Sequence, residues 1–122
     1  KYVAVLDPTL MGSVDVAAGL PADGALIVNT ILTPQAIRRQ IKLTGRRVFT
    51  VDASKISLET IGRDIPNTPM LGALVKVSNF LKIEDVLRDL ETELKKKFAA
   101  KPEIVAGNLQ AVDRAYREVR AE

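Results

Sequence analysis

The chain has 122 residues, of which 47% are hydrophobic and 27% charged, and its formal net charge is +3. This composition is typical of one globular domain and argues against disorder, and no apolar run approaches the roughly 18 residues of a membrane-spanning helix. Histidine, cysteine and tryptophan are absent, which excludes a Ser-His-Asp triad, a cysteine nucleophile, disulfides and the usual ligand sets of zinc and iron–sulfur clusters.

The first half of the chain predicts three short buried strands, over residues 2–6, 25–28 and 47–51. Between the first two strands, Ser13 is a candidate N-cap for a short helix through Ala18. Between the second and third, Thr33-Pro34 has the form of an N-cap followed by proline at the first helical position, and that helix runs to about Leu43. Continuous apolar runs, rather than alternating ones, are typical of parallel strands covered on both faces.

The second half predicts helices. One follows the third strand, from about Ala53 to Ile61. Thr68-Pro69 again resembles an N-cap plus proline, and it opens a helix from Met70 to about Phe80 that is apolar nearly all round. Residues 83–98 carry an apolar stripe at helical spacing, with acidic residues in the first turns and lysines in the last, and a final helix follows Pro102.

This order of elements predicts the fold class. Strands that alternate with helices indicate βαβ units and a parallel sheet. We therefore expect an α/β fold, with a Rossmann-like parallel sheet, flanking helices and a helical C-terminal segment, in a single domain over residues 1–122. Three short strands leave exposed sheet edges, which proteins usually extend or cover, so we expect the chain to be one part of a larger assembly.

Polar residues follow each predicted strand and are the weak candidates for ligand or cofactor binding: Asp7, Asn29 and Asp52. Ligands of open α/β sheets bind at the carboxyl ends of the strands. The competing interpretation is that the two aspartates cap the turn or helix that follows. The chain has neither a GxGxxG nor a GxxxxGK[ST] motif, so no phosphate-binding loop of either kind is predicted. No catalytic or metal-ligating residue is predicted.

The positive charge is concentrated in one stretch. Between Asp23 and Asp52 there is no acidic residue, whereas five cations lie there. Of these, Arg38, Arg39 and Lys42 are expected on the outer face of the helix that starts at Pro34. This basic face either meets an acidic partner or a nucleotide phosphate, or is simply solvated. Nucleic-acid binding is not expected, because the chain has only two tyrosines, three phenylalanines and no tryptophan for stacking.

The apolar helix near Pro69 predicts an interface. A helix that is apolar on all sides is buried on several of them, and so small a domain has difficulty covering it alone. We expect a partner to contact Asn67, Thr68, Met70, Leu71 and Leu74. The alternative is that this helix is pure core.

Four segments resemble a known family: Val5–Leu10 (VLDPTL), Asp23–Thr30 (DGALIVNT), Val48–Ile56 (VFTVDASKI) and Ile65–Ala73 (IPNTPMLGA). Through them the chain resembles the gamma subunit, or gamma domain, of the 2-oxoacid:ferredoxin oxidoreductases. Pyruvate:ferredoxin oxidoreductase (pyruvate synthase) is the nearest type. The likeness extends over essentially all 122 residues, and the stretch from Thr50 to Ala73 is its most specific part.

The resemblance implies a cytoplasmic enzyme of anaerobic metabolism that oxidatively decarboxylates a 2-oxoacid, forms acyl-coenzyme A and reduces ferredoxin. It implies thiamine diphosphate, Mg²⁺ and iron–sulfur clusters on the alpha, beta and delta subunits, with this chain inactive alone and placed on the coenzyme A side. The family domain normally begins with a βα unit that carries a glycine-rich GxGGQG-type loop, so we expect this sequence, which lacks it, to be the C-terminal portion. The alternative is a free-standing regulatory or small-ligand-binding α/β module that uses Asp7, Asn29 and Asp52. Neither nucleic acid nor a membrane is expected as a partner.

Overall fold

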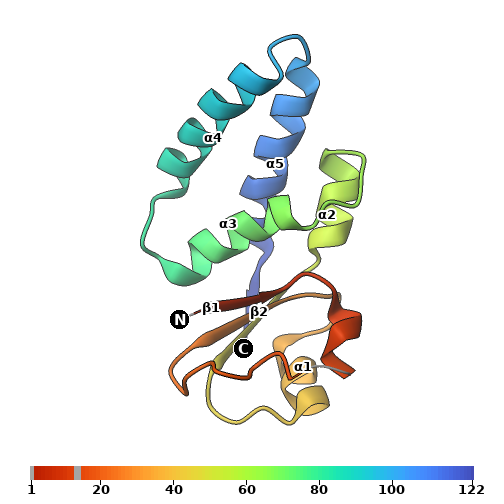
Figure 1. Ribbon diagram of the computed structural model, residues 1–122, viewed down its shortest axis with the longest axis vertical. Helices are drawn as coiled ribbons and strands as arrows, with labels where there is room; N and C mark the ends of the chain where they lie inside the picture. Colours follow the sequence, from red (N-terminus) through yellow and green to blue (C-terminus); the bar gives the residue numbers. More distant parts are fainter. Residues whose placement is uncertain (1, 13–14) are drawn as a thin grey trace.

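In the computed structural model, which describes residues 2–12 and 15–122, a four-stranded sheet separates two layers of helices (Figure 1). The α/β class and the parallel sheet are therefore confirmed. The elements follow the chain in the order β1 (Tyr2–Val5), the 3₁₀ helix η1 (Pro8–Gly12), β2 (Ala25–Asn29), α1 (Pro34–Ile41), β3 (Arg47–Val51), α2 (Ala53–Thr60), α3 (Asn67–Ser78), α4 (Ile83–Lys97), α5 (Pro102–Glu118) and β4 (Arg120–Ala121).

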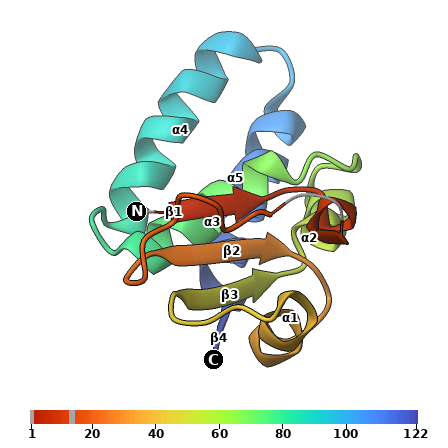
Figure 2. The ribbon, with the colours of Figure 1, turned by 60° about the horizontal axis from the view of Figure 1, so that its bottom comes forward.

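The sheet has the strand order β1-β2-β3-β4 (Figure 2). The first three strands are parallel, with Tyr2 opposite Ala25 and Ala25 opposite Arg47, whereas β4 runs antiparallel to β3 with Ala121 opposite Phe49. The carboxyl ends of β1, β2 and β3 consequently meet at one edge of the sheet. The strand β4 was not predicted, and it covers the edge of β3 that would otherwise be exposed.

Two hydrophobic cores form because β2 is covered on both faces. Ala25 and Ile27 contribute to the core beneath α2, α3 and α5, and Leu26 and Val28 to the core on the side of α1. Every residue of β2 is buried. This explains why its sequence is a continuous apolar run and does not alternate with polar residues.

The caps predicted for two helices are present. The Thr33 hydroxyl accepts a hydrogen bond from the amide of Ala36 at 3.2 Å, with Pro34 in the first turn of α1. The Asp52 carboxylate likewise caps α2, accepting from the amide of Lys55 at 3.2 Å. Each side chain satisfies a donor that has no partner within its helix.

Of two other predicted helix starts, one is wrong and one lies outside the described residues. Ser13, the candidate N-cap, lies outside them, and residues 15–19 form turns in which the amide of Ala18 donates to the Asp15 carbonyl at 3.1 Å. Thr68 is not an N-cap, because α3 already begins at Asn67, with Pro66 in the N-cap position. Pro66 has φ −66°, which its ring fixes near the helical value, so the helix starts earlier than the Thr-Pro pattern predicts.

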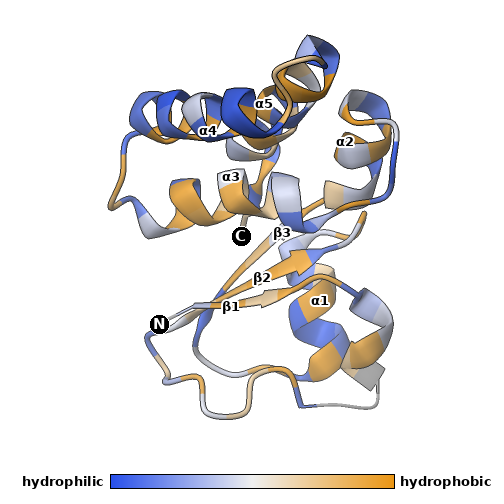
Figure 3. Ribbon diagram, turned by 45° about the horizontal axis from the view of Figure 1, so that its top comes forward, coloured by the Kyte–Doolittle hydropathy of each residue, from blue (hydrophilic) through white to orange (hydrophobic). Residues whose placement is uncertain are grey.

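The helix α3 lies between the sheet and the pair formed by α4 and α5 (Figure 3). It approaches α5 closely at Gly72, where an added Cβ would stand 1.9 Å from the carbonyl oxygen of Val112. A similar approach occurs at Gly107 of α5, where a Cβ would stand 2.5 Å from the carbonyl oxygen of Thr60. Glycine at both crossings lets the helix backbones touch. Within the described residues, no helix combines the length and apolarity needed to cross a bilayer.

Candidate functional site at the carboxyl edge of the sheet

Asn29 holds the carboxyl ends of the strands together. Its side chain is only 4% exposed. The Nδ2 group donates to the carbonyl of Leu6 and to the hydroxyl of Ser54, both at 2.9 Å, while Oδ1 accepts from the amide of Ser54 at 3.2 Å. This one amide therefore joins the end of β1, the end of β2 and the start of α2. Both of its N–H donors are used, so its role in the structure is positional.

The two aspartates are also engaged locally. Asp7 accepts from the amide and the hydroxyl of Thr9, at 3.0 and 2.7 Å. The hydrogen bonds from the Thr9 side chain and backbone lower the pKa of Asp7. Asp52 caps α2 through the amide of Lys55. The capping interpretation therefore describes both residues, and ligand binding by Asp7, Asn29 and Asp52 stays a prediction.

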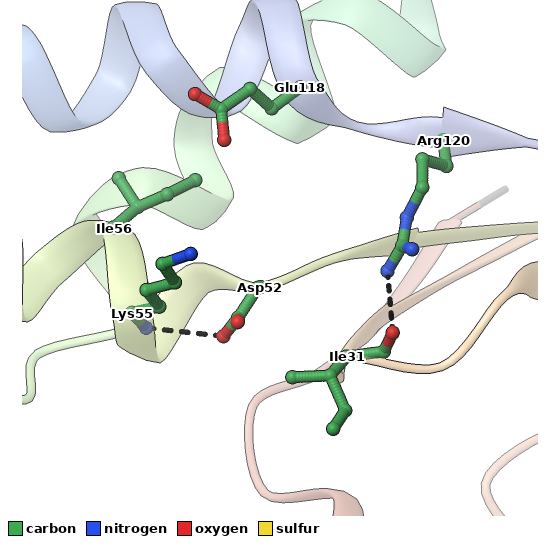
Figure 4. Close-up of a pocket in the computed structure, with 6 residues that line it drawn as sticks. All are labelled: Ile31, Asp52, Lys55, Ile56, Glu118 and Arg120. Atoms are coloured by element: carbon green, nitrogen blue, oxygen red, sulfur yellow. Dashed lines mark hydrogen bonds between the residues drawn. The ribbon is translucent and has the colours of Figure 1, made fainter.

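Asp52 nevertheless lines an open pocket of about 360 Å³, together with Ile31, Lys55, Ile56, Glu118 and Arg120 (Figure 4). Its lining holds two carboxylates, two cations and two isoleucines. Because this pocket carries charges of both signs, it suits polar contacts with a partner better than the binding of a single ion. No cluster of three or more potential metal ligands occurs among residues 2–12 and 15–122.

Arg120 fixes the loop that borders this pocket. Its Nη2 group donates to the carbonyls of Thr30, Ile31 and Leu32, at 3.3, 3.1 and 2.9 Å. Figure 4 shows the guanidinium reaching from β4 to the Ile31 carbonyl. One side chain of a two-residue strand thus holds three consecutive peptide units. No pattern in the sequence predicts this contact, because it depends on β4 lying beside β3.

Large apolar side chains are exposed around the same edge. Leu6 is 42% exposed, Leu10 47%, Ile31 74% and Leu32 41%, and all four lie in the segments that follow β1 and β2. Exposed apolar residues gathered at one edge are typical of a contact surface. Sequence reasoning missed them. The available signal was the pair Ile31-Leu32 between two threonines, in a loop where no core-facing periodicity requires apolar residues.

The predicted interface on α3 is corrected in part. Met70 is 4% exposed and belongs to the core beneath α2, α3 and α5, against which Leu74 also packs. Met70 therefore belongs to the core, in agreement with the alternative interpretation of this helix. Leu71 is 38% exposed, Asn67 is exposed and Thr68 is half-buried. For these three residues an interface stays a prediction.

The predicted basic face is also corrected in part. Arg38 does not project freely, because its guanidinium binds the Glu122 carboxylate through Nε at 2.7 Å and Nη2 at 2.6 Å. It also donates to the carbonyls of Leu43, Gly45 and Arg46, at 3.1, 2.7 and 2.6 Å. The pKa of Glu122 is lowered by this pairing. Arg39 and Lys42 are exposed, and their contact with an acidic ligand stays a prediction.

Comparison with known proteins identifies the family. Residues 1–118 match the sequence pattern of the family described as "Pyruvate ferredoxin/flavodoxin oxidoreductase". The chain is a member of this family. It is 40% identical over 118 residues to the pyruvate synthase subunit PorC of Thermotoga maritima, covering 97% of this chain and 59% of that protein. It is 39% identical over 118 residues to the pyruvate/ketoisovalerate oxidoreductases common subunit gamma of Pyrococcus abyssi, covering 97% and 60%.

The fold is that of a solved oxidoreductase subunit. The crystal structure of pyruvate oxidoreductase subunit PORC from Thermotoga maritima matches with a TM-score of 0.84 at 38% identity, over 99% of this chain and 64% of that one. The resemblance to the gamma subunit is therefore confirmed, and a free-standing ligand-binding module is not favoured. The chain spans about 60% of the length of the curated relatives it matches.

Proposed function

We propose that this chain serves as a gamma-subunit segment of a 2-oxoacid:ferredoxin oxidoreductase, with pyruvate as the 2-oxoacid. The assembled enzyme oxidatively decarboxylates pyruvate, forms acetyl-coenzyme A and reduces ferredoxin in the cytoplasm. The observation that carries the proposal is the 36–40% identity to PorC and gamma subunits over 95–97% of this chain. The residues matched include the three parallel strands and all the helices that cover the sheet.

The residues of this chain are poorly suited to bind the cofactors of such a complex. Iron–sulfur clusters are held by cysteine thiolates, with histidine in some centres, and this sequence has neither residue. The acidic side chains of the described residues do not gather into a group of three that would suit Mg²⁺. We therefore assign thiamine diphosphate, Mg²⁺ and the clusters to the alpha, beta and delta subunits. In this proposal the chain is inactive alone and stands on the coenzyme A side.

What this chain supplies is a pre-formed contact surface at the carboxyl edge of the sheet. Ile31 and Leu32 present apolar side chains from a loop whose carbonyls are held by Arg120. Because the loop is already ordered by these hydrogen bonds, less conformational entropy is lost when a partner covers it. Removal of the Ile31 side chain from water is favourable in proportion to its exposed apolar area.

Co-expression with the alpha, beta and delta subunits of the same organism tests the proposal. We expect this chain to co-purify with them, and pyruvate- and coenzyme A-dependent ferredoxin reduction to require it. Ile31→Lys should weaken assembly at least tenfold, because it places a charge in the contact. The matched control is Leu81→Lys, an equally drastic change at a residue that is 63% exposed in the segment between α3 and α4.

The outcomes separate two claims. If the unaltered chain fails to co-purify and the other subunits are fully active without it, the subunit role is wrong. If it assembles and Ile31→Lys assembles equally well, the subunit role holds and the contact surface is elsewhere.

A further inference from the structure

A second pocket lies at the amino edge of the sheet, where β3 begins, α3 ends and β4 lies beside β3. Its volume is about 430 Å³, within the range of small-molecule sites. Its lining residues come from these three elements and the residues next to them: Arg47, Phe49, Lys76, Val77, Asn79, Val119 and Ala121.

The charge of this pocket has one sign. Arg47 and Lys76 line it, and no aspartate or glutamate does. Neither cation forms an ion pair in the part of the chain that the structure describes. The pocket at the carboxyl edge differs, since Asp52 and Glu118 accompany its two cations. The amino-edge pocket is therefore the one that favours an anion.

Aromatic rings position both cations without using their hydrogen-bond donors. The Arg47 guanidinium carbon lies 5.7 Å from the centroid of the Phe49 ring, and the Lys76 Nζ lies 5.2 Å from the centroid of the Tyr116 ring. A cation over a ring face is attracted to the ring's electrons. Its N–H groups remain available for an acceptor, five on an arginine and three on a lysine.

Apart from the two cations and Asn79, the floor of the pocket is apolar. Phe49 and Val119 are half-buried and pack against the core beneath α3, and Val77 is buried within it. An inorganic anion would meet the cations and leave this floor in contact with water. An uncharged ring would cover the floor and leave the cations without an acceptor. Only a molecule that carries both groups uses the whole pocket.

We propose that this pocket binds a small organic anion, with its phosphate or carboxylate group between Arg47 and Lys76 and its apolar part on Phe49 and Val119. Charge-assisted hydrogen bonds to the anionic group provide orientation, and burial of the apolar part provides affinity. This site goes beyond the proposed function and does not rest on it, because every residue it uses belongs to this chain.

The test is an NMR titration of the ¹⁵N-labelled full chain with phenyl phosphate and, separately, phenylacetate. Inorganic phosphate and phenol are the reference compounds, each carrying one of the two groups. We expect saturable shifts of the Phe49, Lys76 and Val119 amides, and binding of at least one of the two aromatic anions at least tenfold tighter than either reference compound. The tighter of the two identifies the preferred anionic group.

Two charge-neutralising double variants make the test specific. Arg47→Gln with Lys76→Gln should weaken binding at least tenfold, whereas Lys97→Gln with Lys101→Gln, which removes the same charge from exposed positions elsewhere, should leave it within twofold. The amide spectra also establish that each variant is folded. Equal weakening by both double variants would mean general attraction to a basic protein and would overturn the site. Absence of shifts at the pocket with both aromatic anions would overturn it as well.

Discussion

The close approach of α3 and α5 predicts that Gly72→Ala destabilises the chain. The added Cβ would stand 1.9 Å from the carbonyl oxygen of Val112, 2.8 Å from its carbonyl carbon and 3.0 Å from the amide nitrogen of Tyr116. All three atoms are backbone, so no rotation of a side chain relieves the contact. Non-bonded heavy atoms of this kind prefer separations of about 3.5 Å, so the two helices must move apart by more than about 1 Å.

Two opposing effects set the magnitude. Overpacking a well-packed core by one carbon costs about 1–3 kcal/mol, and a backbone obstacle places this site at the upper end. Replacing a helical glycine by alanine otherwise stabilises by about 0.5–1 kcal/mol. The net expectation is a free energy of unfolding lower by about 2 kcal/mol. For a domain of this size that corresponds to a Tm lower by about 8 °C.

Urea unfolding followed by circular dichroism, with a thermal scan as a second measure, tests the sign as well as the size. The double variant with Val112→Ala is the control. Because the obstacle is the Val112 carbonyl and not its side chain, Val112→Ala should not rescue the loss. A neutral or stabilising Gly72→Ala, as at an exposed helical glycine, would refute the close crossing. Rescue by Val112→Ala would place the obstacle on the side chain instead.

Three further predictions concern the other contacts. Because Arg38 lowers the pKa of Glu122, the stability from this pair is present above the ordinary carboxyl pKa and is lost as pH falls through the lowered value. Arg38→Gln should therefore lower the free energy of unfolding by more at pH 7 than at pH 3, whereas Arg39→Gln should change neither. Leu74→Lys should unfold the free chain, since Leu74 packs against the core, and Leu71→Lys should leave circular dichroism unchanged while weakening co-purification with the partner subunits. Calorimetric titration with Mg²⁺ and thiamine diphosphate should give no binding heat, and micromolar binding would contradict the assignment of that cofactor to other chains.

The sequence predicted a helix or strand correctly where the residues that determine it lie within one turn or one strand. Thr33-Pro34 marks the start of α1 because a hydroxyl and a fixed φ act within one turn, and the run at Ala25–Asn29 marks a strand because both of its faces are buried. The same kind of signal failed at Thr68. There Pro66 already begins the helix, and the Ser57 hydroxyl, which accepts from the amide of Ile65 at 2.8 Å and donates to the Arg63 carbonyl, holds the preceding loop.

The candidate site was less predictable, because each of its contacts joins segments far apart in the sequence. Asn29 was identified as a strand-end residue, but its partners Leu6 and Ser54 are 23 and 25 positions away. Arg120 contacts carbonyls 88 to 90 positions away. No periodicity or motif encodes pairs at such separations. The family resemblance supplied the fold and the kind of assembly, but it did not supply these contacts.

The distribution of charge in the stretch from Asp23 to Asp52 shows why counting cations overstates a basic surface. A guanidinium has five donors in a planar fork, so an arginine can bind several backbone carbonyls at once, which a lysine does much less readily. Arg38 binds three carbonyls and a carboxylate, and Arg46 binds the carbonyls of Leu20 and Thr44. Both arginines therefore use their donors on contacts within the chain. The Arg47 guanidinium lies over the Phe49 ring and keeps its donors, so an anion-binding site of this stretch is expected at the amino edge of the sheet, in addition to the exposed Arg39 and Lys42 on α1.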